Sequence, residues 1–322
     1  MRIFITGEQG FIATNLIERM KLHDDMKFIT GAHRQELKYH DEGEPCVHKN
    51  DIYTWKDFFW KNKIDIVIHN AAIVGTDVCA LNSEKSTLTN VQGTYNVCRA
   101  AKHLNIPVCY IGTTVIYVAK KYQHERISED DDRAPHTLYG CQKLCAEDIV
   151  KSQSPKWMIV RPLFAYGGVG DMNSLIAKTI YGALNGKKDI DMFLDPTKIK
   201  DYMHVNDFCD AVLLAINTGL WYQDWNVAAE TPYVTGEIVD ILKNITELDL
   251  TGVLKWHLQT DYLGNHMLTS WKLRKCSKWE PKITLEEGIR MSYESILSSK
   301  GYNPLRYLED AKKRNVDLTE YY

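Results

Sequence analysis

The first twenty residues, MRIFITGEQGFIATNLIERM (residues 1–20), place a short β-branched strand, a turn with two glycines and a helical pattern in immediate succession. Gly7 and Gly10 lie in the turn, and glycine permits positive φ angles and a close approach of the backbone to a ligand. The helix that follows offers unpaired N–H groups and a partial positive charge, which suit a pyrophosphate. Strand, turn and helix in this order predict a dinucleotide-binding turn. A tight strand-to-helix turn without a ligand is the alternative.

Short apolar strands and longer helical patterns alternate through the first half of the chain. This order predicts an α/β fold: a Rossmann-type doubly wound parallel sheet with helices on both faces. We expect the dinucleotide-binding domain over residues 1–165, with return segments near 200–230. A smaller, interleaved C-terminal lobe over residues 166–322 is expected to bind mainly substrate and to end in a charged tail.

The expected elements follow from apolar periodicity and from the glycine and proline residues between them. The expected strands are RIFIT, KFITGA, CVHKND, DIVIHNAA, VCYIGTT and WMIVRP, and the expected helices span residues 12–22, 54–62, 86–104, 139–152, 173–186, 206–218, 234–246 and 284–298.

Composition argues against several classes of function. The formal net charge of −3 over 322 residues gives no basic footprint for nucleic acid or an anionic membrane. No apolar run reaches the roughly 18 residues of a membrane span, and the N-terminus lacks a signal-peptide layout. The eight cysteines form no CxxC pair, which favours free thiols in a reducing compartment over disulfides or a zinc site. We therefore expect a cytoplasmic protein without a metal, a nucleic-acid partner or a membrane partner.

The residues after the second expected strand bear on the choice of cofactor. Dinucleotide sites often carry an acidic residue there, which binds the ribose 2′-hydroxyl. The stretch FITGAHRQ instead brings His33 and Arg34, with no carboxylate before Glu36. Because an arginine suits a 2′-phosphate, the sequence favours NADP(H), with NAD(H) as the alternative. A solvated surface arginine is the competing interpretation.

Tyr139 and Lys143 begin an expected helix in the stretch LYGCQKLCAED (residues 138–148). Residues four apart lie on one helical face, so the lysine ammonium can lie near the tyrosine phenol. Such a pair also occurs by chance in ordinary amphipathic helices. The spacing alone therefore assigns no function.

Seven motifs, in order over residues 1 to about 298, resemble those of the extended short-chain dehydrogenase/reductase family, the nucleotide-sugar epimerases, dehydratases and 4-reductases. The resemblance implies an NAD(P)-dependent enzyme that acts on a nucleotide-activated sugar. At the third glycine position of the first motif this chain has Ala13. The seven stretches are TGEQGFIATNL (6–16), KNDI (49–52), HNAA (69–72), NVQGTYNV (90–97), TLYGCQKLCAE (137–147), DYMHVND (201–207) and WEPKITLEEGI (279–289).

The resemblance implies Thr113, Tyr139 and Lys143 as the catalytic residues. Tyr139 would exchange a proton with a sugar hydroxyl while the cofactor carries the hydride. Lys143 would hold the cofactor and favour the phenolate of a tyrosine whose free pKa is about 10. Thr113, in CYIGTTVIY, would hydrogen-bond the same sugar oxygen; a buried threonine at a strand end is the alternative.

The resemblance also implies two sets of binding residues. The expected cofactor-binding residues are Gly7, Gln9, Gly10, Phe11, Ile12, His33, Arg34, Asp51, Ile52, Asn70, Ala71, Ala72, Asn90, Tyr139 and Lys143. The expected substrate-binding residues are Val74, Thr114, Val115, Phe164, Lys200 and Tyr202.

Departures from the family motifs reduce the number of reactions that the chain is expected to catalyse. The 4,6-dehydratases of the family carry Asp-Glu directly after the threonine, and the 3,5-epimerase/4-reductases of GDP-fucose synthesis carry a cysteine at the second of these positions. This chain has Thr114 and Val115, which provide neither carboxylate nor thiol. Phe164 replaces an asparagine often used on the substrate phosphates, which is reminiscent of 4-keto-sugar reductases. Lys200 stands where many relatives have arginine, so it keeps the charge but loses the bidentate fork.

Two reactions remain open at this point. Reduction of a 4-keto-6-deoxy nucleotide-sugar is favoured, and 4-epimerisation with tightly bound NAD is the alternative. A third hypothesis is a catalytically silent, cofactor-binding regulatory protein, against which the intact Thr113, Tyr139 and Lys143 argue. Family members commonly dimerise through the two helices expected here at 86–104 and 139–152, so we expect a homodimer.

Overall fold

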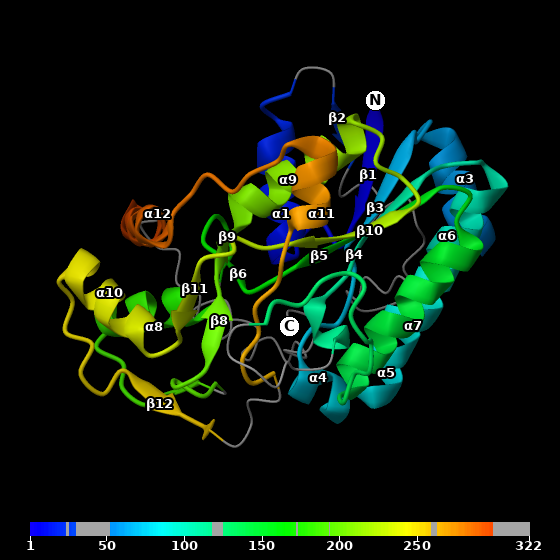
Figure 1. Cartoon of the computed structure of the whole chain (residues 1–322). Coiled ribbons are helices and arrows are strands. Elements are labelled where there is room, and N and C mark those ends of the chain that lie inside the picture. The colour runs from blue at the N-terminus through cyan, green and yellow to red at the C-terminus, as the bar shows by residue number, and fades with distance from the viewer. Residues whose placement is uncertain are drawn as a thin grey trace.

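The computed structural model describes residues 1–23, 26–29, 52–117, 125–171, 173–192, 194–258 and 263–298. In this part of the chain the central element is a six-stranded sheet in the order β2–β1–β3–β4–β5–β10 (Figure 1). All neighbouring strands in it run parallel. The strands are β1 (Arg2–Thr6), β2 (Lys27–Ile29), β3 (Ile66–His69), β4 (Val108–Ile111), β5 (Trp157–Pro162) and β10 (Gln223–Val227).

Helices cover both faces of this sheet (Figure 1). Strand β1 shows why, because Ile3 and Ile5 are buried in the core of one face while Phe4 between them is buried in the core of the other. Such a strand is apolar on both sides and needs a cover on each. One face carries α1 (Phe11–Met20), α9 (Val205–Asn217) and α11 (Trp271–Ser277), and the other carries α3 (Ile52–Lys61), α6 (Thr94–His103) and α7 (Leu138–Gln153). The predicted Rossmann-type α/β class is confirmed.

A smaller lobe has its own apolar core, which includes Ile176, Ile238 and Ile289. Its helices are α8 (Leu175–Leu184), α10 (Glu237–Thr246) and α12 (Leu285–Ser298). Three two-stranded sheets complete it: β6 (Ala165–Tyr166) with β9 (Met203–His204), β8 (Ile199–Asp201) with β11 (Pro232–Val234), and β7 (Ile190–Met192) with β12 (Leu254–Trp256).

The two parts interleave, as expected. After the first segments of the smaller lobe the chain returns to place α9 against α1 and β10 beside β5, and then leaves again (Figure 1). The division of the chain into domains at residue 165 stays a prediction.

Several elements differ from the expectation. The expected helix over residues 86–104 begins with a π-helical turn, Leu88–Gly93, before α6. Two short helices, α4 (Thr76–Leu81) and α5 (Ser83–Thr87), and helix α11 were not expected, because so few residues show little periodicity. The expected strand at 46–51 lies outside the described residues, as do His33, Arg34, Asp51 and the charged tail.

The cysteines of the described segments are free thiols. Four of them are buried, and Cys141, Cys145 and Cys276 are exposed. Among the same residues, no helix has the length and apolar character needed to cross a membrane.

Candidate active site

The glycine turn after β1 packs closely against the loop that follows β3. Gly7 has a φ of +67°, and a Cβ built on it would lie 2.8 Å from the Cα of Ala71. The N–H of Gly10 donates to the carbonyl oxygen of Gly7 at 2.9 Å. Helix α1 then begins at Phe11 without a side-chain cap. The first-turn amides of α1 thus suit a pyrophosphate, and the turn fits a dinucleotide cofactor.

The other cofactor residues predicted in this turn lie at the entrance to α1. Gln9 and Gly10 are exposed, and Phe11 and Ile12 are half-buried against the core beneath the helix. Ile52 is half-buried at the start of α3. Their contacts with a cofactor stay predictions.

A chain of hydrogen bonds joins the glycine turn to the end of β3. The hydroxyl oxygen of Thr6 accepts the backbone N–H groups of Asn70 and Ala71 at 3.1 and 3.0 Å. It lies 2.7 Å from Nδ1 of His69, whose Nε2 lies 3.0 Å from the hydroxyl of Thr94. Since the Thr6 oxygen already accepts two N–H groups, its own hydrogen is directed to Nδ1, and Nε2–H donates to Thr94. The loop that starts at Asn70 is thereby held against the glycine turn.

This histidine was not singled out from the sequence, although it begins the HNAA motif. Burial and, to a smaller extent, the charge of the nearby Lys143 lower the pKa of His69 to about 3. The ring is therefore neutral at physiological pH. It orders the loop and takes no part in proton transfer.

Asn90, in the π-helical turn, holds the same loop from its other side. Its Oδ1 accepts the N–H of Ile73 at 2.7 Å, and its Nδ2 donates to the Ile73 carbonyl oxygen and to Oε1 of Gln142, both at 2.9 Å. A π-helical turn often marks a functional site. Because both amide hydrogens of Asn90 point to protein acceptors, it positions the loop after β3 against α7. A direct contact with a cofactor stays a prediction.

Thr113 and Tyr139, distant in sequence, meet at the carboxyl end of β4. They are 8% and 7% exposed, and their side chains are hydrogen-bonded to each other. Helix α7 begins here because the side chain of Thr137 accepts the N–H of Gly140 at 3.1 Å, an N-terminal cap. Burial raises the pKa of Tyr139 above its ordinary value, and the bond with Thr113 offsets part of that rise. The phenol therefore keeps its proton and can donate it.

Lys143 lies one turn further along α7, on the same face as Tyr139. It is 2% exposed; its Nζ donates to the carbonyl oxygen of Ile111 at 2.8 Å and lies 4.2 Å from the ring centre of Tyr110. Burial lowers the pKa of Lys143, and the charge of Glu147 offsets part of this effect, so that the pKa is about 7. An anionic group bound nearby would favour the charged ammonium.

Thr114 and Val115 follow Thr113 in a short 3₁₀ turn, Thr114–Ile116. Thr114 is buried, and Val115 packs against a small apolar cluster that contains Tyr139 and Cys79. Neither side chain offers an acid or base for loss of water or for carbon-bound proton abstraction.

Three other predicted substrate residues lie together in space. Phe164 packs against Tyr202, with ring centroids 5.5 Å apart and an interplanar angle of 33°. The Nζ of Lys200 lies 5.2 Å from the ring centre of Phe164 and donates to the carbonyl oxygen of Gly264 at 2.9 Å. Val74 is exposed on the loop before α4. The contacts of these residues with a substrate stay predictions.

The structure adds two residues near the cluster that sequence reasoning missed. Cys79 is buried next to Tyr139; burial raises the pKa of its thiol, and its Sγ donates to the Ile73 carbonyl oxygen at 3.3 Å. His266 is fully buried edge-on to Phe164, and burial lowers its pKa to about 3. Cys79 lies on a helix too short to show periodicity, and no motif surrounds His266, so neither carried a signal in the sequence.

Comparison with known proteins identifies the family of this chain. Residues 3–228 match the model of the NAD dependent epimerase/dehydratase family. The chain belongs to this family. The predicted resemblance is thus confirmed, and with it a nicotinamide-dependent enzyme type that modifies nucleotide sugars.

Proteins similar to this chain carry names of several different enzymes. A GDP-6-deoxy-D-talose 4-dehydrogenase from Aggregatibacter actinomycetemcomitans is 27% identical over 252 residues, which are 76% of this chain and 80% of that protein. The structure of RMD from Pseudomonas aeruginosa complexed with NADPH has a TM-score of 0.78 at 19% identity, covering 92% of this chain and 99% of that one. A UDP-glucose 4-epimerase from Thermotoga maritima, with UDP-glucose, has a TM-score of 0.79 at 20% identity, covering 93% and 99%. The two structures show the shared fold.

Proposed function

We propose that this enzyme reduces the C4 keto group of a nucleotide-linked 4-keto-6-deoxy sugar, with NADPH as the hydride donor and Tyr139 as the proton donor. The observation that carries the proposal is the buried Thr113–Tyr139 pair with Lys143 one helical turn away. A phenol that keeps its proton suits reduction, in which the sugar oxygen gains a proton.

In this proposal each residue of the cluster has one task. The bound cofactor supplies the hydride. The hydroxyls of Thr113 and Tyr139 would both face the keto oxygen and donate hydrogen bonds to the negative charge that develops there. Tyr139 would then transfer its proton to this oxygen, and the Lys143 ammonium would stabilise the phenolate that remains.

Two observations argue against the reactions of the family that remove water or a carbon-bound proton. Thr114 and Val115 stand where a dehydratase has its carboxylates and a 3,5-epimerase/4-reductase its cysteine. Cys79, the thiol that does lie beside Tyr139, holds its proton in a hydrogen bond to a backbone carbonyl oxygen. No group in this part of the described site is suited to abstract a carbon-bound proton.

The similarity to a 4-dehydrogenase of a GDP-linked 6-deoxy sugar supports hydride transfer at C4 of such a sugar. The choice of NADPH over NADH rests on Arg34 and on the absence of a carboxylate between the second expected strand and Glu36. The homodimer through α6 and α7 is part of the proposal as well. Cys141 and Cys145 lie on the exposed side of α7 that such a contact would cover.

The second candidate is 4-epimerisation of a nucleotide hexose with retained NAD. It is favoured by the same three residues, because removal and return of hydride at C4 require no further acid or base. The two candidates differ in whether cofactor is consumed.

One experiment separates them. The purified protein is first assayed for copurified cofactor. It is then given GDP- or dTDP-linked 4-keto-6-deoxy sugar with NADPH and, in a separate reaction, a nucleotide hexose without added cofactor, while absorbance of NADPH and the sugar products are followed. Reduction consumes one NADPH per sugar. Retained NAD together with interconversion of two nucleotide hexoses, and no net change in NADPH absorbance, would establish epimerisation instead. Cofactor binding without turnover of either substrate class would favour the regulatory protein.

A further inference from the structure

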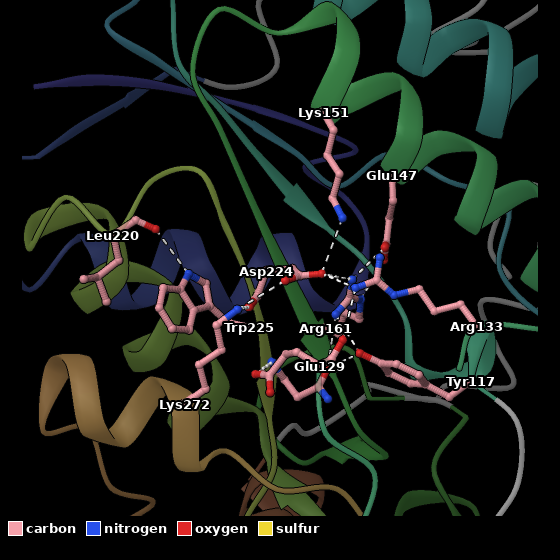
Figure 2. A network of polar contacts seen from close by, with 11 residues as sticks. Tyr117, Glu129, Arg133, Glu147, Lys151, Arg161, Leu220, Asp224, Trp225 and Lys272 are labelled. Atoms are coloured by element: carbon pink, nitrogen blue, oxygen red, sulfur yellow. Dashed lines mark hydrogen bonds and ion pairs between the residues drawn. The ribbon is translucent and has the colours of Figure 1, made fainter. Parts of the chain in front are cut away.

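A buried ion network joins helix α7 to strands β5 and β10 (Figure 2). Arg161, on β5, is fully buried, and its guanidinium donates to both carboxylate oxygens of Glu147 on α7, at 2.8 and 2.7 Å. Its Nη2 also donates to Asp224 on β10 at 2.7 Å. Three charges from one helix and two neighbouring strands thus meet inside the protein. Thr113, Tyr139 and Lys143, the residues predicted for catalysis, do not belong to this network, whereas Glu147 is the last residue of the motif stretch 137–147.

The network contacts both ends of residues 112–117, the segment that carries Thr113. At one end, a Cβ on Gly112 would lie 2.9 Å from both Arg161 Cγ and Glu147 Oε1, so the ion pair packs against this residue. At the other end, Arg161 Nη1 donates to the hydroxyl of Tyr117 at 2.7 Å. Gly112 separates Ile111, whose carbonyl accepts from Lys143, from Thr113 itself. Displacement of Arg161 would therefore move the backbone of the catalytic segment.

Glu147 also acts on Lys143 through its charge. Tyr139, Lys143 and Glu147 follow one another at intervals of four residues, so they lie on one face of α7. The described titratable groups that face Lys143 are Glu147 and Tyr139 from its own helix, Cys79 from α4, His69 from β3 and Tyr110 from β4. Burial keeps the tyrosines and the thiol protonated and the imidazole neutral. Among these groups the carboxylate of Glu147 alone carries a charge.

Asp224 allows the negative charge of Glu147 to act on Lys143. Arg161 paired with Glu147 alone would cancel most of the carboxylate's field at Lys143. Asp224 neutralises the guanidinium from the far side, and although burial works against its ionisation, Arg161 holds the pKa of Asp224 well below its ordinary value. The buried trio of Glu147, Arg161 and Asp224 therefore has one net negative charge, and Glu147 is the member nearest Lys143.

Three further cations surround Asp224 from the outside (Figure 2). Arg133, Lys151 and Lys272 lie 2.5, 3.5 and 3.3 Å from its carboxylate oxygens, and their side chains are 24%, 28% and 30% exposed. Water and salt screen these partly exposed charges far more than the buried ones. Lys151, on the same helix as Glu147, is thus a matched control.

We propose that Glu147, held by Arg161 and Asp224, is a positioning residue that favours the ammonium form of Lys143 beside Tyr139 and fixes the segment of Thr113. The inference rests on the proposed function for the roles of these three residues. The test therefore measures the titration of Lys143 directly and needs no substrate.

The test follows the side-chain NMR signal of Lys143 against pH in protein with isotope-labelled lysine, assigned by its loss in Lys143→Met. Glu147→Gln keeps the shape and removes the charge. We expect it to lower the titration midpoint of Lys143 by about one pH unit, the usual effect of losing an opposite charge on a neighbouring turn. Asp224→Asn should lower it by less, and Lys151→Gln should leave it where it is.

Activity provides a second measurement. If NADPH-dependent reduction occurs, kcat should decline with rising pH, and in Glu147→Gln this decline should occur about one pH unit lower than in the parent. Glu147→Asp keeps a carboxylate, so its decline should lie between those of the parent and Glu147→Gln. A variant that only loosens the fold would lower kcat equally at all pH values.

Two outcomes overturn the inference. One is a folded Glu147→Gln protein with an unchanged Lys143 midpoint. The other, which applies if Glu147→Gln does not fold, is an unchanged midpoint in Asp224→Asn. A shifted midpoint in a protein that reduces no 4-keto sugar would leave the inference standing and reject the proposed function, so the two can fail separately.

Discussion

Lys143 donates a hydrogen bond of 2.8 Å from its Nζ to the carbonyl oxygen of Ile111, across the boundary between helix α7 and strand β4. Ile111 is the last residue of β4, and Thr113 follows it after one glycine. The bond therefore ties the face of α7 that carries Tyr139 to the strand end that carries Thr113, the two residues proposed to act on the substrate. An ammonium has three donors, so two remain for a ligand such as a ribose hydroxyl.

Lys143→Met should change how stability depends on pH. The pKa of Lys143 falls from 10.5 to about 7 on folding, mainly because of burial. Between these values the unfolded chain holds a proton that the folded protein has released, so stability rises with pH. Below pH 7 both states are protonated and this residue adds no slope. Between pH 7 and pH 10.5 we therefore expect the free energy of unfolding of the parent to rise by about 1 kcal/mol per pH unit relative to that of the variant. Urea unfolding of both cofactor-free proteins at several pH values measures it, and parallel curves would contradict the prediction.

Tyr139→Phe should leave the fold and cofactor binding intact and lower turnover by about 100- to 10,000-fold, the usual contribution of a general acid. Tyr222→Phe is the matched control, because its exposed hydroxyl bonds only the Pro155 carbonyl oxygen among the contacts described, at 3.2 Å. Steady-state rates and cofactor titration of both variants give the comparison. A near-normal rate in Tyr139→Phe would reject its role.

Thr113→Val should lower turnover by about 10- to 100-fold, the effect of losing one buried hydrogen bond of about 1–3 kcal/mol. Valine has nearly the same shape but cannot bond Tyr139. Thr113→Ser keeps the hydroxyl and should retain most of the activity. If serine and valine reduce the rate equally, the hydroxyl has no catalytic part.

Gly7→Ala tests the close approach at the glycine turn. Its φ is +67°, and the new Cβ would meet the backbone of Ala71 at 2.8 Å. Gly219 has a similar φ of +72° with nothing within 4 Å, so Gly219→Ala measures the backbone strain alone, about 1 kcal/mol. We expect Gly7→Ala to cost more stability than Gly219→Ala and to weaken cofactor binding. Equal losses of stability would show that the contact with Ala71 is easily relieved.

Arg34→Ala should weaken NADPH binding much more than NADH binding, because it removes the charge expected to face a 2′-phosphate. Fluorescence titration of both cofactors against both proteins measures the preference. A parent protein that strongly prefers NADH would contradict the assignment.

Local features of the site could be predicted from the sequence. Strand, glycine turn and helix follow one another within residues 2–20, and the local geometry of glycine and of a helix N-terminus is the same wherever they occur. Tyr139 and Lys143 share a face because helical periodicity alone decides it. The alternation of short apolar strands and helices was likewise enough to predict the parallel sheet.

The tertiary structure alone decided which distant residues meet. Strand order brings Thr113 to Tyr139, places Arg161 between Glu147 and Asp224, and sets His69 between Thr6 and Thr94. Hydrogen bonds and charges act through distances of a few ångströms in space, and sequence spacing specifies such distances only within a single turn or helix. For residues on different strands the distance depends on the pairing of the whole sheet, so the neutral state of His69 and the field of Glu147 at Lys143 follow only from the folded protein.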